Sequence, residues 1–418
     1  MTRKKIVGIL LFSLIFLDIS VSYAKVYIDI TSPSARRLPI VIEPLGKTPI
    51  AAQIGDILRR DLDFIGLFQL IGERQESEND SFWLSAGAEA LIRGKVFTKG
   101  TGLTVELYLD DIVRGKRLLA KRYRSDIKGW RQVAHRFADD VVERLSGEKG
   151  IFQTGIAFVS RLSGNKELYI MDYDGENIRP VTRNRSINLS PKWSPDGKAL
   201  LFTSFKSGSP AIYSKELATY REKKMVPSRH MNMGGNWSPD GRKLAFTLTR
   251  NGDSDLFMIE RGGKTLRRLT SGWGLDVSPT WSPDGQTIAF VSDRGGNPNI
   301  YLAAADGSDP RRISFDGKYN SSPAWSPDGK WLAYSSLQSG GFRIYIMKRD
   351  GSGTRQLTFG PGNDEEPSWS PDGRFLAFTS TRDGKKNIYI NSVNNGKTIK
   401  LKATAGPDMS PHWSPFLK

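Results

Sequence analysis

The chain has 418 residues, a length that suggests two to three domains, and 38% of them are hydrophobic. Its 42 glycines favour a β-rich fold with tight turns, and the lack of cysteine excludes disulfides, thiolate metal sites and a lipidated N-terminal cysteine. The net charge of +17 comes mainly from single Lys and Arg residues scattered over 151–418, which indicates an acidic protein partner, an anionic envelope surface or simply a solvated surface, and no nucleic acid.

Residues 1–24 have the pattern of a secretory signal peptide. Basic residues at positions 3–5 precede an apolar run over 6–16, and the small residues that end the segment suit a cleavage site. We therefore expect an exported mature chain that begins near Lys25. A membrane anchor is the alternative, but the run is shorter than the roughly 20 apolar residues of a spanning helix. No transmembrane segment is expected in the mature chain.

The next segment, residues 25–36, is expected to form either a separate arm or an ordinary edge strand. Residues 31–35, Thr-Ser-Pro-Ser-Ala, have the composition of a flexible hinge. The residues before this hinge alternate in polarity as a strand does. They are Lys25, Val26, Tyr27, Ile28, Asp29 and Ile30. From the residues alone, both interpretations stay open.

Residues 25–150 as a whole predict a mixed α/β domain, because strand-like runs alternate with two amphipathic helices. The first helix is capped by Thr48 and begins at Pro49. The second begins at about Ile127 and ends at Gly147, which suits a C-cap. The expected strands are 38–42, 68–71, 91–97, 103–109 and 117–123, with residues 98–102 as the turn of a hairpin.

A repeat of 44 residues decides the fold of residues 151–418. Five copies contain the pentapeptide Trp-Ser-Pro-Asp-Gly, in which Ser-Pro-Asp-Gly is typical of a type I turn after a strand. The tryptophans recur without slippage at Trp193, Trp237, Trp281, Trp325, Trp369 and Trp413. Two aromatic positions keep the same period, and each unit holds four strand-like runs. This is the size of a β-propeller blade.

The two ends of the repeat region predict how the ring closes. The first unit, residues 155–183, lacks the strand that leads into a tryptophan, whereas Trp413 lacks the rest of its unit. We therefore expect Pro411–Phe416 to supply the innermost strand of the first blade. The predicted fold is multidomain, α/β and then all-β: a mixed α/β domain followed by a six-bladed β-propeller over 151–418, closed by strand exchange between the termini.

Few residues could carry catalysis. No Gly-x-Ser-x-Gly nucleophile motif accompanies the three histidines, His135, His230 and His412, so a serine hydrolase is not expected. Residues 252–256 resemble a lipase or metal-binding loop, but their place in the repeat is that of a turn. The aspartates of the pentapeptides also suit turns and lie on separate blades. We expect no enzyme activity, no cofactor and no metal site.

Loops at one end of the inner strands are the candidate binding surface. Five positions before each tryptophan stands Asn188, Asn232, Asp276, Asn320, Asp364 or Asp408. An Asx-turn that holds its own loop explains this pattern, and a ring around the mouth of the central channel explains it as well. The next positions are Leu189, Met233, Val277, Ser321, Glu365 and Met409. Their apolar members suit either a protein-binding surface or packing over the blade ends.

The leader, the α/β domain and the six blades, in this order, resemble the TolB family of the Tol-Pal system of Gram-negative bacteria over the whole mature chain. The resemblance implies a periplasmic, non-enzymatic scaffold that links the inner-membrane TolA complex to the lipoprotein Pal and supports outer-membrane integrity and cell division. Because other propellers share the pentapeptide, a propeller-containing peptidase or lactonase-like hydrolase is the alternative. A sugar or peptidoglycan binder is a third.

The resemblance also implies two protein-binding sites. Pal would dock at the channel mouth, where Ser228–His230 resembles the family's Arg-His loop, although Ser278 stands where members often have glutamate. The expected Pal-binding residues are Arg229, His230, Met233, Gly234, Asp276, Val277, Ser278, Asn320, Ser321, Asp364, Glu365 and Met409. TolA would bind Lys25–Ile30 by strand addition, so the resemblance favours the arm over the edge strand. Other envelope proteins are further candidate partners.

Overall fold

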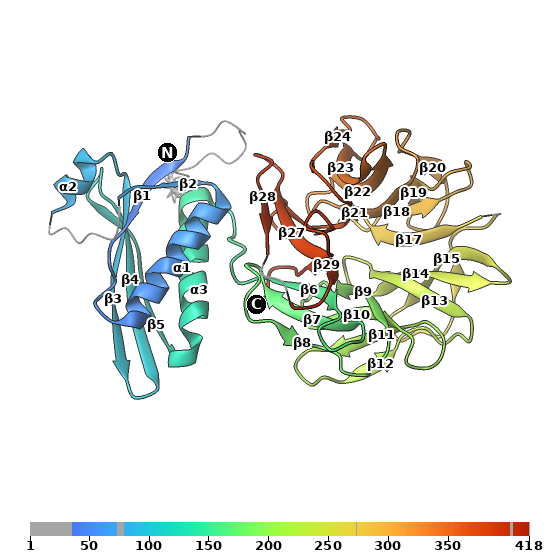
Figure 1. The fold of residues 1–418 in the computed structure, drawn as a ribbon, viewed down its shortest axis with the longest axis horizontal. Helices are drawn as coiled ribbons and strands as arrows, with labels where there is room; N and C mark the ends of the chain where they lie inside the picture. Colours follow the sequence, from blue (N-terminus) through green and yellow to red (C-terminus); the bar gives the residue numbers. More distant parts are fainter. Residues whose placement is uncertain (1–35, 73–78, 273, 402–403, 418) are drawn as a thin grey trace, which may run out of the picture.

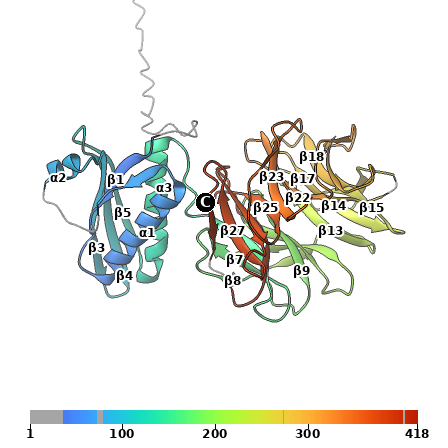
Figure 2. The same cartoon turned by 45° about the horizontal axis from the view of Figure 1, so that its top comes forward.

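The structure is a computed structural model that describes residues 36–72, 79–272, 274–401 and 404–417. The predicted signal peptide and the strand-like residues 25–30 lie outside these ranges. An α/β domain and a β-propeller lie side by side, as Figures 1 and 2 both show. This arrangement confirms the predicted order of the two folds.

The α/β domain is built on a five-stranded sheet with the order β2-β1-β3-β4-β5. Its strands are β1 (Leu38–Ile42), β2 (Phe68–Leu70), β3 (Ala90–Lys99), β4 (Gly102–Asp111) and β5 (Lys116–Asp126). β1 is parallel to β2 and β3, whereas β3, β4 and β5 form an antiparallel meander. Helices α1 (Pro49–Ile65) and α3 (Trp130–Ser146) cover one face of the sheet (Figure 1).

The helix ends follow from local chemistry. Thr48 Oγ1 accepts a hydrogen bond from Ala51 N at 3.3 Å, and Gly66 ends α1 with a φ of 74°. The second helix begins later than predicted, because residues 127–129 form a 3₁₀ turn before Trp130. The sequence analysis did not predict the short helix α2 (Asp80–Ser85), which places Trp83 in a small core on the other face of the sheet.

Six four-stranded antiparallel sheets form the propeller. From the innermost strand outwards, the first blade is β29 (Asp408–Trp413), β6 (Gly155–Ser160), β7 (Glu167–Asp172) and β8 (Arg179–Pro180), and the second is β9 (Asn188–Trp193), β10 (Ala199–Ser204), β11 (Ala211–Glu216) and β12 (Glu222–Lys224). The third blade is β13 (Met231–Trp237), β14 (Lys243–Arg250), β15 (Asp253–Glu260) and β16 (Arg267–Arg268), and the fourth is β17 (Asp276–Trp281), β18 (Thr287–Ser292), β19 (Asn299–Ala304) and β20 (Arg311–Arg312). The fifth blade is β21 (Asn320–Trp325), β22 (Trp331–Gln338), β23 (Gly341–Lys348) and β24 (Arg355–Gln356), and the sixth is β25 (Asp364–Trp369), β26 (Phe375–Ser380), β27 (Asn387–Ser392) and β28 (Thr398–Lys400). The 44-residue period therefore corresponds to one blade.

The ring closes as predicted, because the last strand, β29, pairs antiparallel with β6 of the first blade. Ser414 N donates to Gly155 O at 2.8 Å, and Gly155 N donates to Ser414 Oγ at 3.0 Å. Trp413 Nε1 also donates to Thr154 Oγ1 at 2.8 Å. The closure satisfies the backbone of a strand edge that would otherwise be exposed.

The pentapeptides form the turns that the sequence predicted. Gly197 N donates to Ser194 O at 2.9 Å, and Gly197 has a φ of 69°, which glycine adopts without steric cost. Asp196 Oδ1 accepts hydrogen bonds from Ser194 Oγ at 2.6 Å and from Lys198 N at 3.1 Å. The aspartate therefore stabilises its own turn. The tryptophans before these turns are buried in the cores between blades.

The two domains share one hydrophobic cluster. Phe64 of α1 stacks on Phe375 of the last complete blade, with ring centroids 4.6 Å apart. Phe375 in turn stacks on Trp413 at 6.4 Å. The interface is thus continuous with the strands that close the ring.

Candidate binding surface at the channel mouth

The inner strands of the six blades surround a central channel. The third residue of five of these strands, and the fourth of β13, has a positive φ between 52° and 62°: Ser190, Gly234, Ser278, Ser322, Glu366 and Ser410. Each lies at an irregularity in the pairing of its inner strand. All six line a cavity of about 100 Å³ in the channel. The repeat therefore places the same irregularity in the inner strand of every blade, where it lines the channel.

The ring of Asn and Asp residues before these bulges is buried, with exposures of 0–6%. Asp408 accepts hydrogen bonds from Thr404 N at 2.7 Å and Thr404 Oγ1 at 2.6 Å. Asn320 Nδ2 donates to Asp316 O at 2.8 Å. These contacts hold the loops that lead into the inner strands, but they join residues four positions apart and are not the Asx-turns that the sequence predicted.

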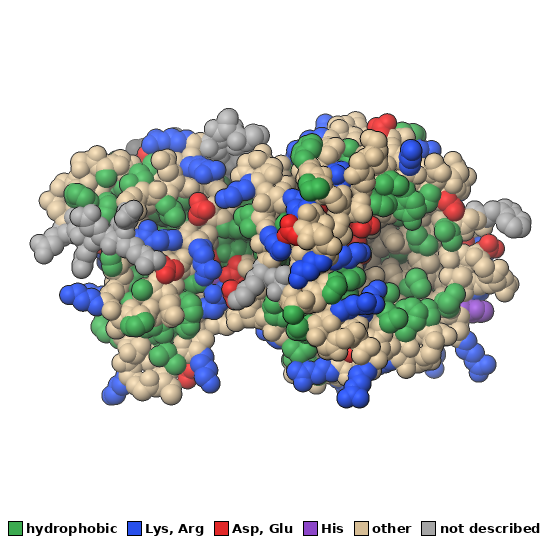
Figure 3. All heavy atoms as spheres, in the orientation of Figure 1, with side chains coloured by type: hydrophobic (Ala, Val, Ile, Leu, Met, Phe, Trp, Pro, Cys, Tyr) green, Lys and Arg blue, Asp and Glu red, His purple; other side chains and the backbone are tan. Residues whose placement is uncertain are grey.

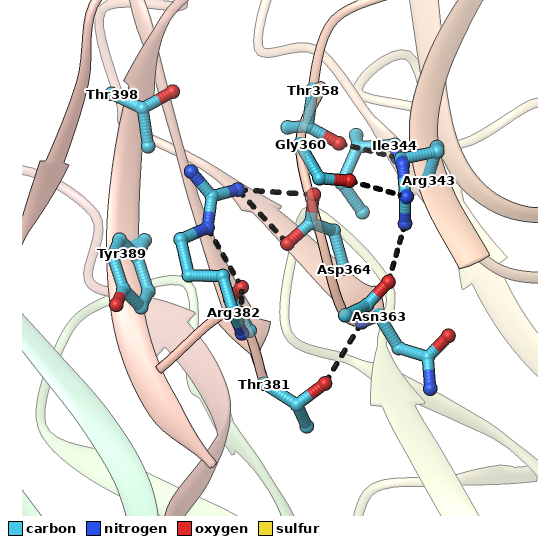
Figure 4. Close-up of polar contacts among 12 residues, drawn as sticks. Arg343, Ile344, Thr358, Gly360, Asn363, Asp364, Thr381, Arg382, Tyr389 and Thr398 are labelled. Carbon is cyan, nitrogen blue, oxygen red and sulfur yellow. Dashed lines mark hydrogen bonds and ion pairs between the residues drawn. The ribbon is translucent and has the colours of Figure 1, made fainter. Parts of the chain in front are cut away.

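Arginine clamps hold the same loops in two blades. Arg382 Nη2 donates to both carboxylate oxygens of Asp364 at 3.0 Å, and its guanidinium lies 4.7 Å from the ring centre of Tyr389 (Figure 4). Two blades earlier, at the corresponding position, Arg294 Nη2 donates a hydrogen bond to Asp276 Oδ2 at 2.7 Å. A buried carboxylate paired in this way fixes the start of the inner strand.

The loop over residues 359–363 is held further by Arg343, as Figure 4 shows. Its guanidinium donates to Gly362 O at 2.6 Å and to Gly360 O at 2.5 Å, and Asn363 Oδ1 accepts a hydrogen bond from Phe342 N at 3.0 Å. The same loop carries Phe359, whose side chain is 66% exposed. The contacts therefore fix an apolar side chain in a solvent-exposed position.

Exposed apolar side chains recur in the loops that lead into the inner strands and at the start of β13. They are Ile187, Met231, Met233, Leu275, Phe315, Tyr319 and Phe359. Phe315 is 71% exposed, and it stands 44 residues before Phe359. Apolar patches of this kind on a soluble surface are typical of protein-binding sites. These residues belong to the segments that lead into or begin five of the six inner strands, β9, β13, β17, β21 and β25, at the end where the Asn and Asp ring lies.

The predicted Pal-binding residues divide by exposure. Arg229, His230, Met233 and Ser278 are exposed. Those partly buried at the mouth are Gly234, Val277, Ser321, Glu365 and Met409. Those buried inside their loops, as described above, are Asp276, Asn320 and Asp364. The structure thus brings the first two groups to one channel end, whereas the last group supports the loops.

The sequence analysis missed the apolar position directly before the Asn and Asp ring. This position holds Ile187, Met231, Leu275 and Tyr319, which are 41–45% exposed. They follow one another at the 44-residue period, so the repeat itself contained the signal. An apolar residue at a loop position in four successive units would have identified the surface.

Lys and Arg side chains are spread over both domains on the face shown in Figure 3. Burial raises the pKa of Glu365 at the mouth, opposed by the attraction of Lys386. Glu366 is bonded to Ser410 N at 2.9 Å and to Thr379 Oγ1 at 2.8 Å, so it bridges adjacent blades. Within the described residues, no cluster of three or more His, Cys, Asp or Glu side chains is arranged to hold a metal ion.

An α/β domain joined to a six-bladed ring defines a two-domain β-propeller protein. The profile described as TolB beta propeller domain matches residues 142–323 and 319–417, and the TolB amino-terminal domain profile matches residues 26–118. The chain belongs to the TolB family. Across the described residues, no helix is long and apolar enough to cross a membrane.

Individual relatives agree with this assignment. The Tol-Pal system protein TolB of Geobacter sulfurreducens is 40% identical over 190 residues, covering 42% of this chain and 44% of the relative. That of Syntrophus aciditrophicus is 38% identical over 207 residues, covering 44% of this chain and 46% of the relative. The matched part thus spans less than half the length of these curated relatives. The crystal structure of TolB from Acinetobacter baumannii has a TM-score of 0.82 at 27% identity, covering 94% of this chain and 100% of that one.

Proposed function

We propose that this protein is a periplasmic scaffold of a Tol-Pal system that binds Pal at the mouth of the propeller channel and TolA through residues 25–30, and so supports outer-membrane integrity and cell division. The observation that carries the proposal is the recurrence of exposed apolar residues in the segments that lead into or begin five of the six inner strands, at one end of the channel. The relatives' names as Tol-Pal system proteins support the assignment to that system.

The mouth has the physical properties of a preformed protein-binding surface. Its apolar side chains stand on loops held by buried Asn, Asp and Arg contacts, so little conformational entropy is lost when a partner docks. Met231 and Met233 add flexible, polarisable side chains, which adapt to the shape of a partner. Exposed Arg229 and His230 lie beside them and favour a partner with acidic groups.

A non-enzymatic role is favoured by the surroundings of the histidines. His135 Nδ1 lies 2.7 Å from Asp61, as in a catalytic pair, but the histidine is buried, and the other oxygen of this carboxylate accepts a hydrogen bond from the hydroxyl of the buried Tyr173. His412 lies in the channel and accepts a hydrogen bond from Trp193 N. The tryptophans of the repeat are only 3–8% exposed, which also disfavours a sugar-binding site, because a sugar stacks on an open ring face.

The Pal site is tested by placing charge among these apolar residues. The double variant Met231→Asp and Met233→Asp should weaken the Kd for lipid-free Pal at least tenfold in calorimetry, because two carboxylates would have to be desolvated on docking. Val113→Asp, at an exposed apolar position of the α/β domain, is the matched control and should bind as the parent does. Unchanged affinity of the double variant would show that Pal does not dock at this surface.

The TolA site is tested independently. Deleting residues 25–30 should abolish TolA binding in surface plasmon resonance, because strand addition depends on main-chain hydrogen bonds from that segment. Pal binding should stay equal or become tighter. A shortened chain that still binds TolA would exclude the arm as its site.

A further inference from the structure

The channel has a second cavity at the end opposite the Asn and Asp ring. Its volume is about 420 Å³, within the range of small-molecule sites. The six tryptophans of the repeat line it, together with the prolines of their pentapeptides. Pro195, Pro239, Pro283 and Pro327 are exposed and form part of its rim. The repeat therefore builds an apolar wall of buried tryptophans and exposed prolines around one mouth of the channel.

A single cation stands in this wall. Lys192, in the inner strand β9, lines both this cavity and the smaller one at the bulges. Among the described residues, its ammonium has no hydrogen-bond or ion-pair partner. Glu366 acts on it only at longer range, and the oxygens of that carboxylate already accept hydrogen bonds from Ser410 and Thr379. The tryptophan-lined cavity itself has no Asp or Glu among the described residues that line it.

His412 supplies a second polar group in the same wall. Its Nδ1 accepts a hydrogen bond from Trp193 N at 3.2 Å, so the neutral ring carries its proton on Nε2. Burial lowers the pKa of His412 well below its ordinary value, and the positive charge of Lys192 adds to this effect. The ring is therefore neutral at physiological pH. Its Nε2–H is a hydrogen-bond donor, and both His412 and Lys192 line the cavity.

We propose that the tryptophan-lined cavity binds a carboxylate carried on an apolar body, with Lys192 as the counter-ion and His412 as a second donor. A partly buried, unpaired ammonium favours an anion that restores its electrostatic partner. The exposed prolines of the rim contact the apolar body, which becomes desolvated at the same time. A neutral ligand of the same shape would leave the ammonium unpaired, so the site discriminates by charge.

The carboxylate can come from a small organic acid or from the free C-terminus of a peptide. Two pairs of probes distinguish these sources: benzoate with benzamide, and N-acetylphenylalanine with its amide. Each pair differs in charge and has nearly the same shape. The site should bind the acid of each pair at least tenfold more tightly than the amide. Tighter binding of benzoate would identify a small organic acid as the ligand, and tighter binding of N-acetylphenylalanine would identify the C-terminus of a peptide.

The test uses the mature chain and calorimetry or saturation-transfer NMR with these four probes. Lys192→Met should lose acid binding, and Lys198→Met, which removes an exposed lysine of the adjacent turn, should retain it. Because Lys192→Met removes a partly buried charge that has no partner, we expect the variant to fold, and thermal melting should confirm it. Equal binding of acid and amide, no acid binding at all, or full acid binding by Lys192→Met would each overturn the proposal.

The pH dependence provides an additional measurement. Burial lowers the pKa of Lys192 to about 8, against an opposing effect of Glu366. Deprotonation of the lysine at higher pH removes the counter-ion. The affinity for benzoate should therefore fall at least fivefold between pH 7 and pH 9.5, and a flat profile would contradict the role of Lys192. None of these outcomes depends on Pal or TolA binding, so this inference stands or fails apart from the proposed function.

Discussion

Tyr173, which follows β7 in the first blade, donates a hydrogen bond of 2.5 Å to Asp61 Oδ1 in helix α1. The other oxygen of Asp61 lies 2.7 Å from His135 Nδ1 in helix α3, and Arg131 of the same helix reaches Asp174 of the blade at 2.7 Å. Burial raises the pKa of Asp61, while its bonds to His135 and Tyr173 oppose the shift. A buried polar network thus joins the two domains beside the stack of Phe64 on Phe375.

Removing the tyrosine hydroxyl should weaken the domain interface. Tyr173→Phe keeps the ring, which packs against Phe64 and Phe152, but leaves one oxygen of a buried carboxylate without its donor. We expect a loss of about 1–3 kcal/mol in the free energy of unfolding, measured by urea titration. Tyr220→Phe, at an exposed turn, is the control and should change stability by less than about 0.5 kcal/mol. Equal stability of the two variants would show that the hydroxyl contributes nothing at the interface.

A second buried carboxylate should make stability depend on pH. Burial raises the pKa of Asp139 to about 6, although Gln153 and the backbone of Phe152 donate hydrogen bonds to it. Because this pKa lies above the unfolded value of about 3.9, the folded state binds the proton more tightly. The protonated form therefore stabilises the fold at low pH, and this contribution is lost as the pH rises from about 4 to about 6.

Asp139→Asn tests that dependence, because the amide stays neutral at every pH. The unfolding free energy of the variant relative to the parent should increase between pH 4 and pH 7 by on the order of 1–3 kcal/mol. Thr101→Ala, an exposed substitution that changes no titratable group, is the control and should give a difference that does not change with pH. A flat difference for Asp139→Asn would refute the raised pKa.

The sequence predicted those parts of the fold that repeat or that have a local signal. The 44-residue spacing of Trp193 and its equivalents defined every blade, and Thr48 with Pro49 defined the start of α1. The short helix around Trp83 was missed, because six residues are too few for a helical period to show. Its cap at Asn79 was the one available signal.

Contacts between distant residues could not be predicted in the same way. Asp61 is 74 residues from His135 and 112 from Tyr173, and nothing local in either segment shows that the three side chains meet. The channel mouth could be predicted from the sequence only in part. Its Asn and Asp ring was recognised, but burial decides that Asp364 supports a loop while Phe359 is exposed on it. Burial depends on the packing of adjacent blades, which the pattern of one unit does not contain.

Strand exchange should be essential for the propeller. A chain that ends at Leu401 lacks β29, which removes the inner strand of the first blade and exposes the edge of β6. We expect loss of the cooperative thermal transition of the propeller. A chain that ends at Phe416 keeps β29 and the Ser414 contacts to Gly155, so it is the control and should melt cooperatively. Unchanged melting of the shorter chain would contradict the closure argument.

The arginine clamp beside Phe359 should control how rigidly the channel mouth presents its apolar side chains. Arg343→Leu removes the hydrogen bonds to the carbonyl groups of Gly360 and Gly362 without touching an exposed residue of the surface. We expect the amide hydrogens of residues 359–363 to exchange at least tenfold faster, because local opening of the loop becomes easier. Arg343→Lys should give an exchange rate between those of the parent and of Arg343→Leu, since an ammonium lacks the planar fork that contacts several carbonyls at once.

The same variants connect loop order to binding. If a prearranged loop reduces the entropy lost on docking, Arg343→Leu should weaken Pal binding about three- to tenfold in calorimetry, with a less favourable entropy of binding. Arg311→Leu, an exposed arginine of an outer strand, should leave both exchange and affinity unchanged. Faster exchange with unaltered Pal affinity would mean that the loop of Phe359 lies outside the docking surface, and that surface would then be restricted to the blades that carry Ile187, Met231 and Leu275.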